Sequence, residues 1–479
     1  MRDVRRSDLG SIDVREEGML ESMPDESAGG DLLGNPSTAR RLSPGETFYW
    51  LVDRICSTNF TVAARLTGPL DHDALSASLS AVQGRHPLLR VRISAEKEGP
   101  VFRTDGVGPI PLRAAAVPEG VWIAEAEREI NETFDWRRGP LIRCVWLRHQ
   151  GPESTLMVTF HHAVGDGISG GYLMRDLLGA MAAPGRHRSP PLPEALPEAL
   201  DRLGPSEVGG ARGYIRYFGE LFRAGKQIAR YGRLRAVNAD ARAPYRTRRA
   251  RVIANILDPS FTTELVARTR REGTTVHGAL SAAVLLGGLC EIPAREPVLM
   301  ALGSPVNMRD RVNPPVGEMA GMYASAVGTI HRVGKGTPFW DLAREIRGAI
   351  DAGFTRKMYF TYEPMTFRIL SRLRRFVGTS DGGVMRFARL ATAFFPSAGF
   401  GLTNIGKPDI EEGRAVPRVS WVALLPSWSV FAHSGWSSAT VGGRLSFTFV
   451  YMEPLLARTH AEELAERTVG ILRAAVRGR

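Results

Sequence analysis

Apolar residues recur at every second position in some segments of the chain and at intervals of three and four residues in others. The first pattern predicts strands and the second predicts helices, and the two kinds of segment mix without strict alternation. We therefore expect an α+β fold of two lobes rather than one doubly wound sheet. Strands are predicted over residues 59–66, 88–93, 141–147, 155–160, 251–257, 298–306, 400–405, 418–424, 428–433 and 445–451. Helices are predicted over residues 46–54, 72–84, 121–133, 170–181, 259–271, 275–289, 339–354 and 457–477.

Changes in composition divide the chain into four expected segments. Residues 1–42 show little apolar periodicity, and the first 31 residues hold four arginines against nine acids, so we expect a disordered acidic tail. An N-terminal lobe is expected over residues 43–182 and a C-terminal lobe over residues 251–479. Residues 183–250 are expected to form a crossover linker, because this segment begins with a run rich in proline.

The composition narrows the class of protein. The 479 residues are 43% hydrophobic and 23% charged, which is typical of a globular chain. No stretch of about 18 uncharged apolar residues occurs, which excludes a transmembrane helix, and the N-terminus lacks the apolar core of a secretory signal. Cys56, Cys144 and Cys290 are far apart and odd in number, so they predict neither a disulfide framework nor a metal site. We expect a cytoplasmic protein.

The net charge of +12 is concentrated in one segment. Residues 211–251 hold 12 basic residues against Glu220 and Asp240, and large apolar residues recur at helical spacing within residues 213–235. Three interpretations stay open: a packed crossover helix, a dock for an acidic carrier protein or the phosphates of CoA, and a peripheral contact with an anionic membrane. No nucleic-acid-binding motif accompanies the charge, so we expect no nucleic-acid partner.

Two adjacent histidines carry the strongest chemical signal. His161 and His162 follow the predicted strand at 155–160 and precede Asp166-Gly167, a pair that favours a tight turn. Because side chains alternate along a strand, one imidazole is expected to face a cavity and the other to pack. A neutral imidazole with a pKa near 6.5 is a suitable general base. Adjacent histidines at a strand end diverge and no other histidine or cysteine cluster supports them, so we expect no metal.

A covalent serine mechanism is an alternative for the same region. Residues 167–171 and 378–382 both fit the pattern Gly-x-Ser-x-Gly, and Ser169 is the better candidate nucleophile of the two serines. A nucleophile elbow needs its first glycine directly after a strand, whereas Gly167 lies seven residues past Phe160. The spacing therefore favours histidine chemistry over a serine nucleophile.

The segment His161-His162-Ala163-Val164-Gly165-Asp166-Gly167 resembles the HHxxxDG signature of the chloramphenicol acetyltransferase and condensation-domain superfamily. Within that superfamily the chain looks most like the polyketide-associated acyltransferases that resemble phthiocerol dimycocerosyl transferase. The resemblance extends from about residue 42 to residue 477. Further matching blocks are Gly68-Pro69-Leu70-Asp71 with Arg85-His86-Pro87-Leu88-Leu89-Arg90, Phe134 to Arg143, Pro305 to Arg309 and Leu402 to Gly406.

The resemblance implies two chloramphenicol acetyltransferase-like lobes arranged as a V-shaped pseudo-dimer, with the active-site tunnel between them. His162 would be the general base that faces this tunnel. Asp166 would be structural and would orient the motif by pairing with an arginine, for which Arg309 is the candidate. Gly167 would leave room at the turn, and its N–H would help to hold the oxyanion.

The resemblance also assigns supporting residues. It implies that His161 packs, that Thr403 and Asn404 contact substrate, and that His86 is structural. Two departures narrow the family branch: the Asp-Phe-Gly-Trp-Gly motif of plant acyltransferases is missing, and His277-Gly278 stands where wax synthases carry Asn-Asp.

Together these observations predict an acyltransferase that moves an acyl group from a thioester to a hydroxyl of a small-molecule natural product or a lipid. The donor would be the phosphopantetheine of an acyl carrier protein or CoA, and no other cofactor is expected. The expected enzyme is a monomer that acts without a covalent intermediate. Two alternatives stay open, a free-standing condensation enzyme that forms an amide or ester between carrier-bound substrates and a catalytically silent docking module.

Overall fold

The computed structural model describes residues 39–182, 195–205, 210–377, 380–394, 399–410, 417–428 and 430–478. Most of the expected acidic tail and residues 183–194 of the expected linker lie outside this set. The described part belongs to one compact unit over residues 36–479. The last four residues of the expected tail are ordered, because Ala39–Arg41 form strand β1, which pairs with residues 101–103, and Leu42 is buried.

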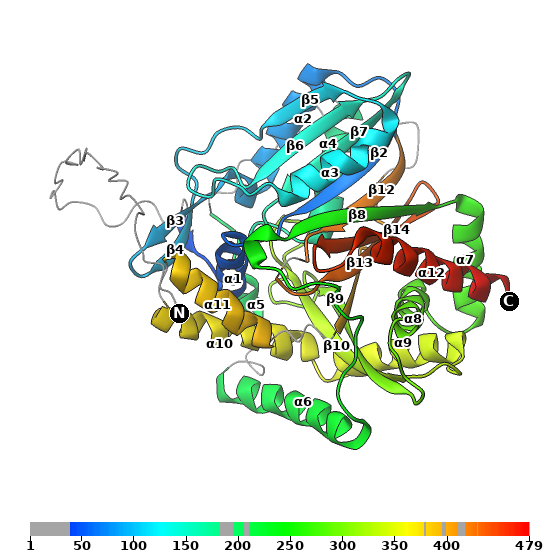
Figure 1. Cartoon of the computed structure of the whole chain (residues 1–479). Coiled ribbons are helices and arrows are strands. Elements are labelled where there is room, and N and C mark those ends of the chain that lie inside the picture. Colours follow the sequence, from blue (N-terminus) through cyan, green and yellow to red (C-terminus); the bar gives the residue numbers. More distant parts are fainter. Residues whose placement is uncertain are drawn as a thin grey trace, which may run out of the picture. The chain divides into compact units, whose positions relative to one another are not determined.

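Five strands form the first large sheet (Figure 1). They are β2 (Phe60–Thr67), β5 (Leu112–Ala116), β6 (Ile142–Arg148), β7 (Glu153–Phe160) and β12 (Arg418–Pro426), in the order β12-β2-β7-β6-β5. Neighbouring strands run antiparallel except for the parallel pair β5 and β6. The helices packed around this sheet are α2 (His72–Arg85), α3 (Trp122–Asn131) and α4 (Gly167–Ala182).

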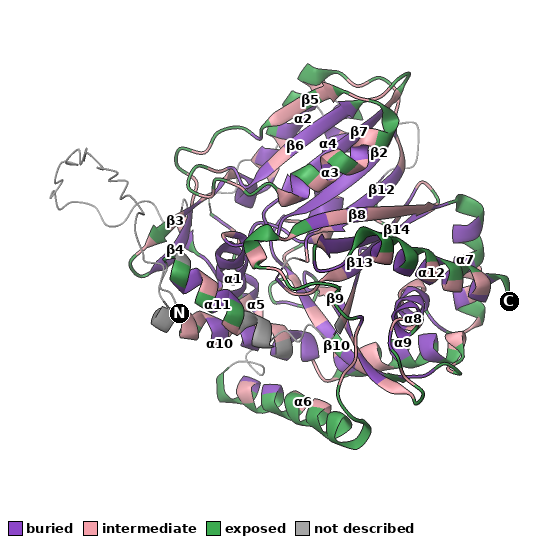
Figure 2. Ribbon diagram, viewed as in Figure 1, coloured by how far each residue is buried: buried purple, intermediate pink, exposed green. Residues whose placement is uncertain are grey.

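Six strands form the second large sheet, in the order β10-β9-β11-β13-β14-β8. They are β8 (Arg249–Leu257), β9 (Val298–Asn307), β10 (Ala324–Val333), β11 (Gly399–Asn404), β13 (Ser434–Val441) and β14 (Arg444–Glu453). The helices that pack with it are α7 (Pro259–Arg271), α8 (Val276–Leu289), α9 (Phe339–Thr355) and α12 (Arg458–Arg477). Helix α8 is almost wholly apolar because α9 and α12 pack against it and bury it (Figure 2).

The remaining elements flank the two sheets. Strands β1, β3 (Arg92–Glu96) and β4 (Gly99–Arg103) form a small sheet in the order β1-β4-β3. Helix α10 packs against α1, α6 and α11, and against β10. The flanking helices are α1 (Pro44–Asp53), the short α5 (Leu200–Leu203), α6 (Gly210–Tyr231), α10 (Met358–Val377) and α11 (Asp381–Phe394). Short 3₁₀ turns occupy Pro87–Arg90, Glu119–Val121 and Tyr245–Thr247.

Strand β12 joins the two halves of the chain. It comes late in the sequence, yet it pairs with β2 of the first sheet from Pro426 opposite Phe60 to Arg418 opposite Thr67. It also contacts β13 and β14 of the second sheet. The expected fold of two sheet-containing lobes is therefore present, but a division of the chain at residue 250 does not follow the sheets.

Two predicted strands differ from the structure. Where a strand was predicted at 88–93, Pro87–Arg90 form a 3₁₀ turn, and the strand begins only at Arg92. The ring of Pro87 fixes its own φ angle at a value that suits the start of this turn. In the segment predicted as a strand at 428–433, the described residues 428 and 430–433 form no strand, and the N–H groups of Phe431 and Ala432 donate to the carbonyl of Trp428. The large side chains explain the apolar pattern, because Val430 is buried and Trp428 and Phe431 line a cavity.

Strand β10 was not predicted, and its burial pattern explains why. Alternate residues along it are buried, as in any strand with one covered face. Three of the buried residues are polar, namely Ser325, Thr329 and His331, so the alternation of apolar and polar residues is missing. His331 is satisfied by Thr329 and Glu345, and Ser325 donates to the carbonyl of Tyr359.

Candidate active site

The histidine pair lies at the junction of β7 and α4. The N–H of His161 continues the sheet by donating to Leu141 at 3.0 Å, and Val164 closes a turn by donating to His161. His161 is buried: its Nδ1 accepts the Ala163 N–H at 3.0 Å, and its Nε2 lies 3.6 Å from a carboxylate oxygen of Asp53. Burial lowers its pKa, against the opposing charge of Asp53. His161 is therefore held inside the first lobe, on the packing side of the pair.

His162 faces the opposite way and lines a cavity. Its ring stacks on Tyr49 of α1, with centroids 4.1 Å apart and planes 12° apart, and it also contacts the ring of Phe60. Nδ1 is buried and has no hydrogen-bond partner among the described residues. We therefore infer that Nε2 is the ring nitrogen that faces the cavity. Burial lowers the pKa of His162 to about 4, against smaller opposing effects of nearby main-chain groups and of Asp166. The imidazole is thus neutral at physiological pH.

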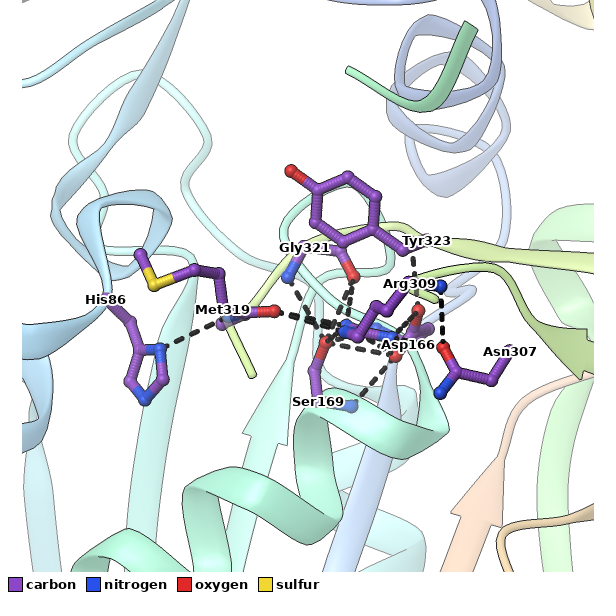
Figure 3. Close-up of polar contacts among 9 residues, drawn as sticks. His86, Asp166, Ser169, Asn307, Arg309, Met319, Gly321 and Tyr323 are labelled. Atoms are coloured by element: carbon purple, nitrogen blue, oxygen red, sulfur yellow. Dashed lines mark hydrogen bonds and ion pairs between the residues drawn. The ribbon is translucent and has the colours of Figure 1, made fainter. Parts of the chain in front are cut away.

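Asp166 is fixed from several sides (Figure 3). Its two carboxylate oxygens accept from the two terminal nitrogens of Arg309 at 3.0 and 3.2 Å, and both side chains are only 1% exposed. The N–H groups of Ser169 and Tyr323 donate to it at 2.8 and 2.9 Å. Burial would raise its pKa, but Arg309 and these donors hold the pKa below its usual value. The contact expected between Asp166 and Arg309 is present, and it fixes the turn after the histidines to the strand end at Asn307.

The guanidinium group of Arg309 also donates hydrogen bonds to residues other than Asp166. It donates to the carbonyls of Met319 and Gly321 and to the side chains of Asn307 and Ser169. A buried charge that is paired and fully hydrogen-bonded in this way costs far less than an unpaired one. The network therefore connects α4 with the loop before β10.

Neither candidate serine is placed for nucleophilic catalysis. Ser169 is buried in this network: its Oγ lies 3.0 Å from Asp166 and donates to Gly321 at 3.0 Å, and Arg309 donates to it at 2.8 Å. Ser169 does not line the cavity beside His162. Ser380 is exposed and accepts the N–H of Gly383, and residues 378 and 379 of its motif lie outside the described residues. The geometry disfavours the serine alternative.

The cavity beside His162 has a volume of about 340 Å³ and lies where the two sheets approach each other. Thr403 and Asn404, at the end of β11, lie on its wall, as do Asp166 and Gly167. Most of its other walls are apolar, a composition typical of small-molecule sites. The apolar wall residues include Phe60, Ile168, Pro305, Val306, Met322, Ile405, Leu424, Trp428 and Phe431.

Gly167 begins α4 beside the ends of β11 and β12. A Cβ at this position would lie 3.0 Å from the methyl groups of both Ile405 and Leu424. Glycine therefore allows the first turn of α4 to approach β11 and β12 closely. The positive end of the helix macrodipole lies at this first turn, beside the cavity.

Glu363 is a site residue that the sequence reasoning missed. It lies on α10 and lines the same cavity as His162, with the side chain of Ser325 and the main chain of Ala326 beside its carboxyl group. Burial raises its pKa to about 7, and these two polar neighbours only partly oppose this effect. No element was predicted between the helix at 339–354 and the strand at 400–405, and no local motif there signals a buried acid.

Tyr49 was also missed. Its helix was predicted, but the contact with His162 joins residues far apart in sequence. Burial raises the pKa of the Tyr49 phenol well above its usual value, so the phenol stays protonated and neutral. Its ring packs flat on the imidazole of His162. Only the tertiary structure brings these two rings together.

His86, for which the resemblance implies a structural role, lies outside the cavity beside His162. It is buried, its Nε2 lies 3.0 Å from Asp176, and its Nδ1 accepts the N–H of Ala320. Within the residues described, no group of three metal-binding side chains could hold an ion, and no helix is long and apolar enough to cross a membrane.

Two family models match the chain. Residues 53–197 match the condensation domain, and residues 246–385 match the C-terminus of phthiocerol/phthiodiolone dimycocerosyl transferase. Among curated proteins, phosphinothricin tripeptide synthetase PhsC of Streptomyces viridochromogenes is 27% identical over 332 residues. That alignment covers 66% of this chain and 28% of the synthetase. Malpinin synthetase of Mortierella alpina is 33% identical over 121 residues, which are 24% of this chain and 2% of that protein.

Solved structures share the fold over more than nine-tenths of the chain. Polyketide synthase associated protein 5 from Mycobacterium tuberculosis is 17% identical, with a TM-score of 0.62, and covers 93% of this chain and 99% of its own. The first condensation domain of the calcium-dependent antibiotic synthetase is 18% identical, with a TM-score of 0.66 and coverages of 92% and 97%. SgcC5 from Streptomyces globisporus is 18% identical, with a TM-score of 0.62 and coverages of 91% and 98%.

Proposed function

The chain belongs to the condensation-domain superfamily and carries a C-terminal part of the phthiocerol/phthiodiolone dimycocerosyl transferase type, and on this premise we propose that it transfers an acyl group from a thioester to a hydroxyl. One observation carries the proposal: a neutral, stacked imidazole lies on the wall of an apolar cavity, with one nitrogen open to that cavity. Such an imidazole is a general base in position beside a substrate-sized space.

In the proposed reaction, Nε2 of His162 takes the proton of the acceptor hydroxyl as its oxygen attacks the thioester carbonyl. The resulting oxyanion is held by the N–H of Gly167 at the first turn of α4. When the tetrahedral centre collapses, the carbon–sulfur bond breaks, and the imidazolium returns the proton to the leaving thiolate. The products are an ester and a free thiol, and no acyl-enzyme forms.

The remaining residues support this step by position. Tyr49 sets the plane of the His162 ring, and the pair of Asp166 and Arg309 fixes the turn that carries both His162 and Gly167. Asp166 and Arg309 are positioning residues, because their charges are turned toward each other. Thr403 and Asn404 also line the cavity and offer hydroxyl and amide groups for binding substrate.

The donor is a thioester of CoA or of the phosphopantetheine of a carrier protein. The condensation-domain match supports the carrier form, and the transferase-type C-terminus supports an alcohol acceptor of a small-molecule natural product or a lipid. Both thioesters present the same reacting atoms to His162. A panel of acyl-CoA and acyl-carrier donors with detection of free thiol separates them.

The test replaces His162 with Ala and with Gln. Turnover is expected to fall by roughly 10² to 10⁴-fold in both variants, since a positioned general base contributes about that factor. The matched control is His72→Ala, which alters an exposed histidine outside the cavity. Thiol release that continues at the wild-type rate in His162→Ala would overturn the mechanism.

A free-standing condensation enzyme is the second candidate, and the match of residues 53–197 to the condensation domain favours it. The same base would take a proton from an amine instead of a hydroxyl, and the product would be an amide. Paired acceptors that differ only in this group, assayed with one donor, distinguish the two enzymes. If neither acceptor is acylated and no thioester is consumed, the chain is a silent docking module.

A further inference from the structure

Helix α6 exposes an apolar face that a packed crossover helix would bury. Ile215, Phe218 and Phe222 are 72%, 59% and 69% exposed. They follow one another at intervals of three and four residues, so they share one face of the helix. All the exposed large hydrophobic residues in the part of the chain that the structure describes lie on α6, the others being Leu221, Ile228 and Tyr231.

A basic face lies directly beside the apolar face. At about 100° per residue, Arg212, Arg216, Arg223, Lys226 and Arg230 fall on one adjoining arc of the helix. All five are exposed, and Glu220, which lies outside that arc, pairs with Arg223. The two arcs together make the amphipathic surface, defined here as these five cations with Ile215, Phe218 and Phe222.

A third side of α6 attaches the helix to the rest of the molecule (Figure 2). Tyr217 is buried and accepts a hydrogen bond from Thr366 of α10, and Tyr214 accepts one from Arg372. Glu220 pairs with Arg356 at 3.1 Å. Because α10 contacts this side, the amphipathic surface is turned toward solvent.

We propose that the amphipathic surface of α6 binds the surface of an anionic lipid membrane. Three large apolar side chains that are exposed to water are stabilised when they enter the boundary between headgroups and acyl chains. Five cations beside them are attracted to acidic phospholipid headgroups at the same depth. The helix therefore lies parallel to the membrane plane, with its Tyr217 side facing the protein.

The apolar residues decide between a membrane and the other interpretations. A dock for CoA phosphates or for an acidic carrier needs cations but gains little from two exposed phenyl rings. A packed crossover helix needs neither exposed rings nor a separate basic arc. Both features are used only when the partner has an anionic surface over an apolar interior, as a bilayer has.

The position of α6 gives the contact a use. Helix α10 lies between α6 and the cavity, because it contacts α6 through Thr366 and lines the cavity through Glu363. A membrane on the outer side of α6 is thus one helix away from the site beside His162. An apolar substrate dissolved in that membrane would be held close to the cavity.

The experiment measures binding of the full chain to vesicles by sedimentation. One set is phosphatidylcholine alone, and the other is phosphatidylcholine mixed with phosphatidylglycerol. The protein is expected to sediment with the mixed vesicles and to bind them less as salt rises, because the Debye length shortens. Failure of the wild-type chain to sediment with mixed vesicles at low salt overturns the proposal.

Two variants test the two arcs separately. Arg212→Gln with Arg216→Gln and Arg230→Gln is expected to weaken binding to mixed vesicles by roughly a hundredfold, at about fivefold for each cation. Phe218→Gln with Phe222→Gln is expected to weaken it at least tenfold for each ring. None of these residues lies in the site, so turnover of a short soluble thioester should not change.

The matched control removes three exposed arginines elsewhere, Arg270 and Arg271 on α7 and Arg473 on α12. Its net charge equals that of the α6 arginine variant. If the control loses as much binding as that variant, the attraction belongs to the net charge and the proposal fails. Binding of an acidic carrier protein that depends on the α6 cations, with no binding of vesicles, would also overturn it in favour of a protein dock.

Discussion

Burial shifts two titratable residues of the cavity in opposite directions. It lowers the pKa of His162 to about 4 and raises the pKa of Glu363 to about 7. The cause is the same, because a poorly hydrated environment disfavours whichever form is charged. The result is a base that stays neutral and an acid that titrates near physiological pH.

The first residue-scale prediction concerns the pH dependence of turnover. Because His162 in the folded protein binds a proton only near pH 4, the acid limb of kcat/KM should lie near pH 4 rather than near 6.5. The Glu363→Gln background removes the titration near pH 7 from the profile. Measured in that background from pH 5 to 8, the rate should be flat, and a limb centred near 6.5 would contradict the assignment of His162.

Glu363 gives a prediction about stability. The unfolded carboxyl releases its proton near pH 4.5 and the folded one near 7, so stability falls as pH rises through this window. Glu363→Gln should abolish that fall and raise the free energy of unfolding at pH 8 by up to about 3 kcal/mol. Urea unfolding at pH 5 and pH 8 measures it, and an equal effect at both values would refute the shift.

The pair of Asp166 and Arg309 predicts a loss of stability rather than of chemistry alone. Removing one partner leaves the other buried and unpaired, which costs about 3 to 5 kcal/mol. Asp166→Ala should therefore lower the midpoint of urea unfolding, whereas Glu264→Ala, on the exposed face of α7, should not. An inactive Asp166→Ala with wild-type unfolding would instead make Asp166 a catalytic residue.

At the level of elements, close approach of α4 to β11 and β12 shapes the site. Gly167→Ala adds a methyl group 3.0 Å from Ile405 and Leu424, and such crowding costs about 1 to 3 kcal/mol. Turnover should fall, and Gly167→Ala combined with Leu424→Ala should recover part of it. Gly219→Ala on α6, where nothing lies within 4 Å, serves as the control.

The sequence predicted most elements because their signals are local. Helix α7 has the predicted bounds, Pro259–Arg271, since Asp258 caps it and Pro259 starts it. The contact of Asp166 with Arg309 was predicted only through a family resemblance, because no local rule connects residues 143 positions apart. Tyr49 and Glu363 were not predicted as site residues, because their place in the cavity depends on how α1 and α10 pack.

At the level of the whole molecule, contacts between the halves should make unfolding cooperative. Asn131 and Glu127 of α3 bond to the main chain of Ala250 and Val252, and β12 pairs with β2. We predict one calorimetric transition whose van't Hoff and calorimetric enthalpies agree. Two resolved transitions would mean that the lobes unfold independently.

Strand β12 comes from the C-terminal half of the chain but belongs to the first sheet, and this affects how the chain can be recombined with its relatives. A chimera with one crossover at residue 250 would place a foreign β12 beside the native β2, at a register set by eight paired positions. It would also place a residue of the relative beside Asp166, where Arg309 forms the ion pair in this chain. Chimeras that carry residues 418–426 and 305–323 together with the N-terminal half keep both matches, so two inserted segments, rather than one junction, mark where this fold can be recombined.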